Sequence, residues 1–196
     1  MRLQINNLLE DKQIHFAKGQ HIIASQGSVV LKSEDGGLSW DVISDIAKSK
    51  LESVLLRFSV YLRLMRKGVH NVFPLPQGGY LIVLKRRFYV LTPEGAIKAL
   101  PFTGKGSRPL RDAVLSHQGC IVYGEYCANP NRNPTSIIET CSTKSRKLYS
   151  FDERRVRHIH ALQYDPYTKH YWIATGDRDD ECIVGIFKDD FQTLEI

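Results

Sequence analysis

The chain of 196 residues has no apolar run approaching the roughly 18 to 20 residues that a membrane-spanning helix needs. Its first residues, Met1 to Asn7, lack the apolar core and small-residue cleavage site of a signal peptide, so export is not expected. The four cysteines show no Cys-x-x-Cys spacing and predict reduced thiols, not a disulfide framework or a zinc site. These absences predict a cytoplasmic protein without a transmembrane segment. The cysteines are Cys120, Cys127, Cys141 and Cys182.

Neither sign of charge dominates, and no composition class is extreme. The 27 Lys and Arg against 21 Asp and Glu leave a net charge of +6, which permits an anionic partner without requiring one. The basic residues are scattered and form no recognition motif, so nucleic acid is not an expected partner. With 42% hydrophobic residues, the chain is long enough to bury the core of one domain.

What the sequence does contain is a repeated order of short strands. Three stretches read strand, tight turn, strand, connection, strand and polar turn, and they begin at Val69, Leu110 and His158. Their polar turns, with an earlier one, start near residues 33, 92, 142 and 188, about 46 to 59 residues apart. A four-stranded antiparallel unit that recurs at such intervals is typical of a β-propeller blade. An open β-sandwich built from similar hairpins is the alternative.

We therefore predict an all-β chain, with residues 1–196 forming a single partial β-propeller of about four blades. The fourth blade ends at Ile196 with a rudimentary last strand, so an incomplete ring is expected. An unclosed ring exposes sheet edges, through which chains can associate. The predicted blades cover approximately residues 1–47, 69–105, 106–155 and 156–196.

Residues 48–67 break the strand pattern and predict an inserted helix. Apolar residues recur at helical spacing, as in Leu51, Val54, Leu55 and Phe58, so that one face is apolar. Packing of this helix on the propeller is the simpler interpretation. An interfacial anchor for an anionic membrane or for a partner is the alternative.

The first polar turn reads Ser33-Glu34-Asp35-Gly36-Gly37-Leu38-Ser39-Trp40. An Asp in a tight turn accepts hydrogen bonds from the backbone amides that follow it, and Gly adopts the left-handed backbone without steric cost. We therefore assign this segment a structural role. The residues with that role are Ser33, Asp35, Gly36, Gly37, Ser39 and Trp40.

This segment matches the Asp-box pattern, Ser-x-Asp-x-Gly-x-Ser/Thr-Trp, and the chain resembles uncharacterised bacterial BNR/Asp-box proteins of the sialidase-like propeller type. The resemblance covers most of the chain after residue 17 and implies the fold far more than the function. Related proteins of this type look longer and continue with further blades. The matching segments are 17–21, 106–109, 124–126, 129–134, 157–167 and 175–181.

Blade topology predicts one polar face. In a propeller blade, the connections from second to third strand share a face with the blade-to-blade connections, opposite the Asp-box turns. Polar segments at 104–109, 124–134, 154–158 and 176–181 belong to this face. The candidate ligand-binding residues are Arg108, Glu125, Tyr126, Asn129, Arg132, Arg157, His158, His160, Asp177, Asp179 and Glu181.

Arginine side chains suit carboxylates and phosphates, including those of acidic sugars. The predicted function is therefore binding of an anionic sugar or of a protein partner, without catalysis. The alternative is a glycan-active enzyme, a glycoside hydrolase or lyase, in which Glu125, His158 and Asp177 are the catalytic candidates. Sialidase chemistry is not expected, because the early Arg-Ile-Pro motif of that family is absent here.

The pair His158-x-His160 places both imidazoles on one side of a strand, since side chains alternate. With Asp177 or Glu181 as a third ligand, this pair could hold a metal ion. Two histidines on a strand are also commonly hydrogen-bonded structural residues. The sequence leaves the third ligand open, and neither a metal nor another cofactor is expected.

Overall fold

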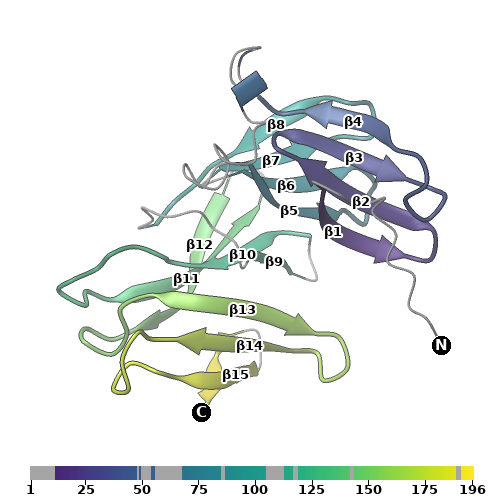
Figure 1. Cartoon of the computed structure of the whole chain (residues 1–196). Helices are drawn as coiled ribbons and strands as arrows, with labels where there is room; N and C mark the ends of the chain where they lie inside the picture. The colour runs from purple at the N-terminus through teal and green to yellow at the C-terminus, as the bar shows by residue number, and fades with distance from the viewer. Residues whose placement is uncertain are drawn as a thin grey trace. The chain divides into compact units, whose positions relative to one another are not determined.

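The computed structural model of the chain describes residues 12–47, 49, 54–55, 68–84, 87–104, 113–116, 119–141, 144–188 and 191–196. Within these residues the chain forms strands β1 to β16, which pair in four sheets of four strands each (Figure 1). In every sheet the strand order follows the chain order, so each sheet is a simple meander. The predicted all-β class is confirmed.

The contacts of the chain divide it into two compact units, which we describe separately. Unit 1 is Met1–Lys85 with Tyr89–Lys98, and unit 2 is Arg86–Phe88 with Ala99–Ile196. No helix among the described residues is long and apolar enough to span a bilayer. Of the predicted helix, Val54 and Leu55 are helical, and most of the remainder lies outside the described residues.

The first two sheets alternate short β-branched and aromatic runs with Gly-containing turns. Unit 1 has its core between them, where Ile23, Val30, Val72 and Ile82 are fully or almost fully buried. The first sheet contains β1 (Gln13–Lys18), β2 (His21–Gln26), β3 (Val29–Ser33) and β4 (Asp41–Asp45). The second contains β5 (Val69–Pro74), β6 (Tyr80–Leu84), β7 (Arg87–Leu91) and β8 (Ile97–Leu100).

The third and fourth sheets form unit 2. The middle strands of the third sheet are buried on both faces: every residue of Ile121–Gly124 is buried, and so is Thr135–Cys141 apart from its half-buried last residue. The core includes Val122, Ile137 and Leu162, and burial of such a side chain contributes about 1.5–3 kcal/mol. The third sheet contains β9 (Ala113–Leu115), β10 (Ile121–Gly124), β11 (Thr135–Cys141) and β12 (Lys144–Phe151). The fourth contains β13 (Ile159–Asp165), β14 (His170–Thr175), β15 (Val184–Lys188) and β16 (Thr193–Glu195).

The prediction of four reduced cysteines is wrong for two of them, because Cys120 and Cys141 form a disulfide. Strands β10 and β11 pair with Ile121 opposite Thr140, which puts the two cysteines opposite each other with their Cα atoms 4.7 Å apart. The spacing is therefore set by a hairpin and not by a Cys-x-x-Cys motif. Since disulfides persist mainly in oxidising compartments, the cysteines no longer support a cytoplasmic location.

The turn between β3 and β4 has the hydrogen bonds expected of its sequence. Asp35 Oδ1 accepts a hydrogen bond from the backbone amide of Ser39 at 2.9 Å, and the Ser33 hydroxyl donates to the same oxygen at 2.7 Å. Gly37 has a φ of +95°, and its carbonyl accepts the indole N–H of Trp40 at 3.0 Å. The hydrogen bonds from Ser39 and Ser33 lower the pKa of Asp35 well below its ordinary range. These contacts agree with the structural role assigned from the sequence.

Candidate functional site

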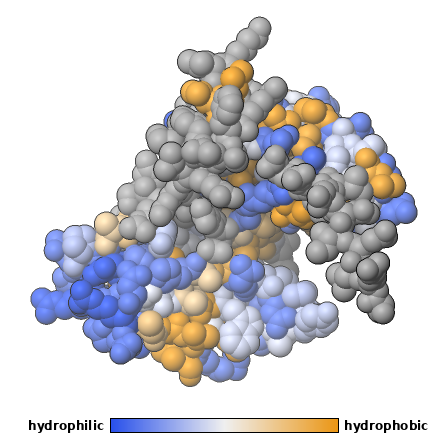
Figure 2. Space-filling model, viewed as in Figure 1, coloured by the Kyte–Doolittle hydropathy of each residue, from blue (hydrophilic) through white to orange (hydrophobic). Residues whose placement is uncertain are grey.

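The candidate site lies at the end of unit 2 where three connections meet. They are residues 125–134 between β10 and β11, residues 152–158 between β12 and β13, and residues 176–183 between β14 and β15 (Figure 1). Figure 2 shows that the surface formed by these connections is predominantly hydrophilic. The site is thus built from two neighbouring sheets of one unit.

A close backbone approach joins these two sheets beneath the site. The amide of Ile159, at the start of β13, donates to the carbonyl of Glu125 at 3.1 Å. Gly124 permits this contact, because a Cβ atom at that position would lie 2.5 Å from side-chain atoms of Ile159. The first residues of β13 are therefore held against the end of β10.

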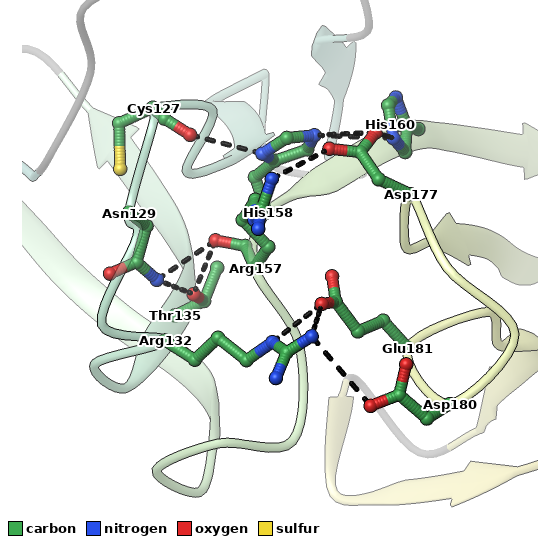
Figure 3. Close-up of polar contacts among 10 residues, drawn as sticks. All are labelled: Cys127, Asn129, Arg132, Thr135, Arg157, His158, His160, Asp177, Asp180 and Glu181. Carbon is green, nitrogen blue, oxygen red and sulfur yellow. Dashed lines mark hydrogen bonds and ion pairs between the residues drawn. The ribbon is translucent and has the colours of Figure 1, made fainter.

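Two histidines and one aspartate meet at this end of unit 2. The Nε2 atoms of His158 and His160 are 3.2 Å apart, and His160 Nε2 lies 3.0 Å from Asp177 Oδ1 (Figure 3). His158 Nε2 lies 3.4 Å from the same Asp177 oxygen. The histidines come from the start of β13 and the aspartate from the connection after β14. A register shift between Ile159 and Ala161 accompanies this arrangement.

Neighbouring groups hold these side chains in place. The Nδ1 atom of His158 lies 3.0 Å from the carbonyl oxygen of Cys127, and Arg157 Nη1 lies 3.5 Å from Asp177 Oδ2. The ring of Tyr126 packs against both imidazoles, with centroid distances of 4.6 Å to His158 and 5.6 Å to His160. We call Tyr126, Arg157, His158, His160 and Asp177 the loop-end cluster.

The loop-end cluster grades from buried to open. The side chain of His158 is 4% exposed, whereas those of His160 and Asp177 are 36% and 40% exposed. Burial lowers the pKa of His158, although Asp177 favours the protonated ring. Burial raises the pKa of Asp177, but its contacts with His158, His160 and Arg157 lower it more, so the pKa is below its ordinary value. At neutral pH the cluster thus combines a neutral buried imidazole with an ionised carboxylate.

A second arginine of the same connections, Arg132, contacts two carboxylates. Arg132 donates through Nε and Nη2 to Oε1 of Glu181, whose side chain is 0% exposed (Figure 3). Its Nη2 atom also lies 3.6 Å from Asp180 Oδ2. This pair ties the β10–β11 connection to the β14–β15 connection directly. The Arg132–Glu181 pair therefore joins two of the connections that carry the loop-end cluster.

Comparison with known proteins identifies the fold. No protein-family model matches the sequence, and no curated protein matches it significantly. Three solved structures match 93–98% of this chain, with TM-scores of 0.54 to 0.58 and identities of 11–14%. They are a gluconolactonase from Xanthomonas campestris (0.55, 14%), a streptogramin B lyase (0.58, 11%) and YCF48 from Cyanidioschyzon merolae (0.54, 14%). The chain has the β-propeller fold.

The chain spans between 53% and 59% of the length of these three propeller structures. At such low identity the likeness concerns the fold alone, so no activity follows from it. The sialidase-like resemblance, and the sugar binding that it implies, stay predictions.

Two predicted site residues have structural roles in the propeller. Glu125 is buried, and its Oε2 atom accepts the backbone amide of Ser136 at 2.8 Å. Asn129 is also buried, and its side-chain amide donates at 2.9 Å to the carbonyls of Asn133 and Arg157. These contacts orient the connections, so neither residue belongs to the loop-end cluster.

The structure selects one of the two candidate third partners of the histidine pair. Asp177 lies beside both imidazoles, whereas Glu181 is taken by Arg132. Asp179 is exposed, and Arg108 lies outside the described residues. Sequence reasoning missed the contact of Cys127 with His158, since a backbone carbonyl has no side-chain signature.

Proposed function

We propose that the chain is a ligand-binding β-propeller and that the loop-end cluster binds an acidic sugar. The observation that carries this proposal is convergence: side chains from three separate connections of unit 2 meet at one partly exposed spot. The contact of Arg132 with the buried Glu181 and the hydrogen bonds of Asn129 join these connections to one another. A cluster of open polar groups on a rigid support is typical of a ligand site.

Arg157 is the group that favours a carboxylate. Its side chain is 25% exposed, and its contact with Asp177 is long, at 3.5 Å. Its Nε atom is buried and has no hydrogen-bond partner among the described residues. A guanidinium has five N–H donors in a planar fork, so Arg157 retains donors for a second carboxylate. Arg132, by contrast, is already bound to Glu181 and Asp180.

The remaining groups of the cluster suit hydroxyl groups. The carboxylate of Asp177 accepts hydrogen bonds, and the imidazole of His160 exchanges them in either direction. Tyr126 contributes an aromatic surface beside them. An acidic sugar offers both features, a carboxylate for Arg157 and hydroxyl groups for Asp177 and His160. A gluconolactonase and a streptogramin B lyase have the same fold, which is compatible with small-molecule ligands.

The test is a calorimetric titration of the full chain with glucuronate, with glucose as the neutral control. We expect glucuronate to bind and glucose to bind at least about 10-fold more weakly, because one charge-assisted hydrogen bond contributes about 1.5–3 kcal/mol. The variant Arg157→Gln should lose about 10-fold or more of the affinity for glucuronate.

Arg155→Gln is the matched control, since Arg155 is exposed in the same connection and the variant loses the same charge. It should bind glucuronate as the wild type does. Equal binding of glucose and glucuronate, or an unchanged affinity in Arg157→Gln, would contradict the proposal. Binding of an acidic peptide in place of glucuronate would favour a protein partner.

A further inference from the structure

Three atoms of the loop-end cluster form a triangle of the size that a metal ion requires. Its corners are Nε2 of His158, Nε2 of His160 and Oδ1 of Asp177, and its sides measure 3.0, 3.2 and 3.4 Å. In a tetrahedral zinc site, with bonds of about 2.0–2.1 Å, neighbouring ligand atoms lie about 3.4 Å apart. An ion near the triangle can therefore reach all three atoms at bonding distance with little rearrangement (Figure 3).

His158 and Asp177 each have a second polar contact outside the triangle, as metal ligands in proteins usually do. The Cys127 carbonyl can only accept a hydrogen bond, so its 3.0 Å contact places the proton of neutral His158 on Nδ1. The lone pair of Nε2 then points toward the other two corners. On the carboxylate, Arg157 holds Oδ2 and leaves Oδ1 for the cluster. The Cys127 carbonyl thus orients His158, and Arg157 orients Asp177, so that both can coordinate a metal ion.

Ligand chemistry and exposure narrow the kind of ion. Two imidazoles with one carboxylate suit Zn²⁺ and related divalent transition metals, whereas Ca²⁺ and Mg²⁺ prefer oxygen ligands. His160 and Asp177 are partly exposed, so one side of the triangle is open. Three protein ligands with an open position are typical of a zinc site that accepts a further ligand.

We infer that His158, His160 and Asp177 bind one divalent transition-metal ion, best matched by Zn²⁺, with an open position toward solvent. The metal site stands on its own geometry, and the role of its open position rests on the proposed function. There the sugar carboxylate that Arg157 contacts would offer its second oxygen to the metal and complete the coordination. The ion would also supply positive charge at a place where the carboxylate of Asp177 alone would repel an anion.

The experiment titrates Zn²⁺ into the full chain, expressed without a histidine tag, treated with a chelator and kept free of reductant. The last condition keeps Cys120 and Cys141 bonded, because their thiolates would bind zinc as well. We expect one Zn²⁺ per chain by calorimetry and a tetrahedral visible spectrum with Co²⁺. His160→Asn and Asp177→Asn should each lower the zinc affinity by about 100-fold or more.

His21→Asn is the matched control. The side chain of His21 is 31% exposed and its Nδ1 lies 2.9 Å from Glu34 Oε2, so it too is a half-buried histidine beside a carboxylate. Its removal should leave zinc affinity unchanged. A thermal melt of each metal-free variant shows that it is folded, and Asp177→Asn, which keeps the side-chain size, carries the test if His160→Asn does not fold. A folded wild type that binds no Zn²⁺, or variants that bind like the wild type, would overturn the inference.

Glucuronate binding, measured with and without Zn²⁺, separates the two proposals. If Zn²⁺ binds at the cluster but glucuronate does not bind, the metal site stands and the proposed function fails. If the chelator-treated chain binds glucuronate and no Zn²⁺, the metal site fails and the proposed function stands.

Discussion

Two arginine–carboxylate contacts lie in the same connections of unit 2. The arginine side chains are about equally exposed, at 24% and 25%, but their carboxylate partners and their contact geometry differ. Arg132 meets Glu181, which is 0% exposed, through two of its nitrogen atoms, and it also contacts Asp180. Arg157 meets Asp177, which is 40% exposed, through one contact of 3.5 Å. We call the first pair closed, because its carboxylate is buried, and the second pair open, because its carboxylate is exposed.

The difference shows how burial assigns a role to a charged residue. A buried carboxylate has lost its hydration and depends on its partner, so the Arg132–Glu181 pair is a structural tie. An exposed carboxylate keeps much of its hydration and contributes little to stability, so Asp177 and Arg157 are available for a ligand. Closed and open pairs should therefore respond in opposite ways to substitution, in stability and in binding.

The largest expected effect comes from breaking the closed pair. Glu181→Gln removes the buried charge opposite Arg132 and should lower the free energy of unfolding by about 3–5 kcal/mol. Asp177→Asn should change it by less than about 1 kcal/mol, because its contacts are solvated. Urea unfolding followed by circular dichroism measures both. Similar losses in the two variants would remove the distinction between the pairs.

A smaller effect is expected at the opposite end of the same strand pair, where the disulfide joins the start of β10 to the end of β11. Cys120→Ser with Cys141→Ser should lower the free energy of unfolding by about 3 kcal/mol, because the bond closes a loop with a sequence separation of 21 residues. Cys182→Ser is the control, since that thiol is free and exposed.

This double variant also sharpens the comparison of the two pairs. If the loop-end cluster is held by Arg132 and Glu181, its zinc affinity should survive loss of the disulfide once the variant is folded. Loss of zinc binding in folded Cys120→Ser with Cys141→Ser would show instead that the far end of the strands holds the cluster. Mass spectrometry with and without reductant checks that the bond is present in the wild type.

The smallest of the three effects extends the comparison to a half-buried histidine in unit 1, His15. Burial, with a contribution from His70, lowers the pKa of His15 from 6.5 to about 4. The unfolded chain therefore binds a proton more readily between pH 6.5 and pH 4, and the folded state loses stability as the pH falls through that window. At pH 5 the loss should reach about 2 kcal/mol relative to neutral pH.

The measurement is the free energy of unfolding of the wild type and of His15→Asn at pH 7 and pH 5. The variant should lose about 2 kcal/mol less than the wild type between the two values, although its stability at pH 7 is also lower because the hydrogen bond to Ser25 is lost. Equal losses in both proteins would mean that His15 is open to solvent, as Asp177 is.

Much of the fold could be predicted because each strand and turn has a pattern of residues in its own short segment of the sequence. Short apolar runs such as Ile121–Gly124, bounded by turn residues, indicate strands by themselves, and their repeated order predicts the blades. The turn at Asp35 was equally predictable, since its hydrogen bonds link residues within a few positions. The alternation of side chains also indicated that His158 and His160 face the same side.

The sequence predicted which segments form the candidate site, but not which of their residues belong to the loop-end cluster and which are structural. Glu125, Asn129 and Glu181 are polar residues in the same connections as the loop-end cluster, but they are buried and bonded to neighbouring groups. Arg132 is half-buried and pairs with Glu181. The disulfide was missed for a related reason, since the facing of Cys120 and Cys141 depends on the register of two strands. Burial and register are properties of packing, which composition and spacing do not report.

The sequence by itself determined the all-β class, the four-stranded repeats, the polar turn at Asp35 and the segments that carry the polar connections. All of these depend on interactions between residues close in the chain. Only the tertiary structure decided that Asp177 and not Glu181 joins the histidines, and that Cys120 and Cys141 are bonded. It also decided that Arg132 pairs with a buried carboxylate and Arg157 with an exposed one. Each of these outcomes is a contact between residues that are distant in the chain. The contacts depend on which polar groups become buried together, because a buried polar group needs a partner.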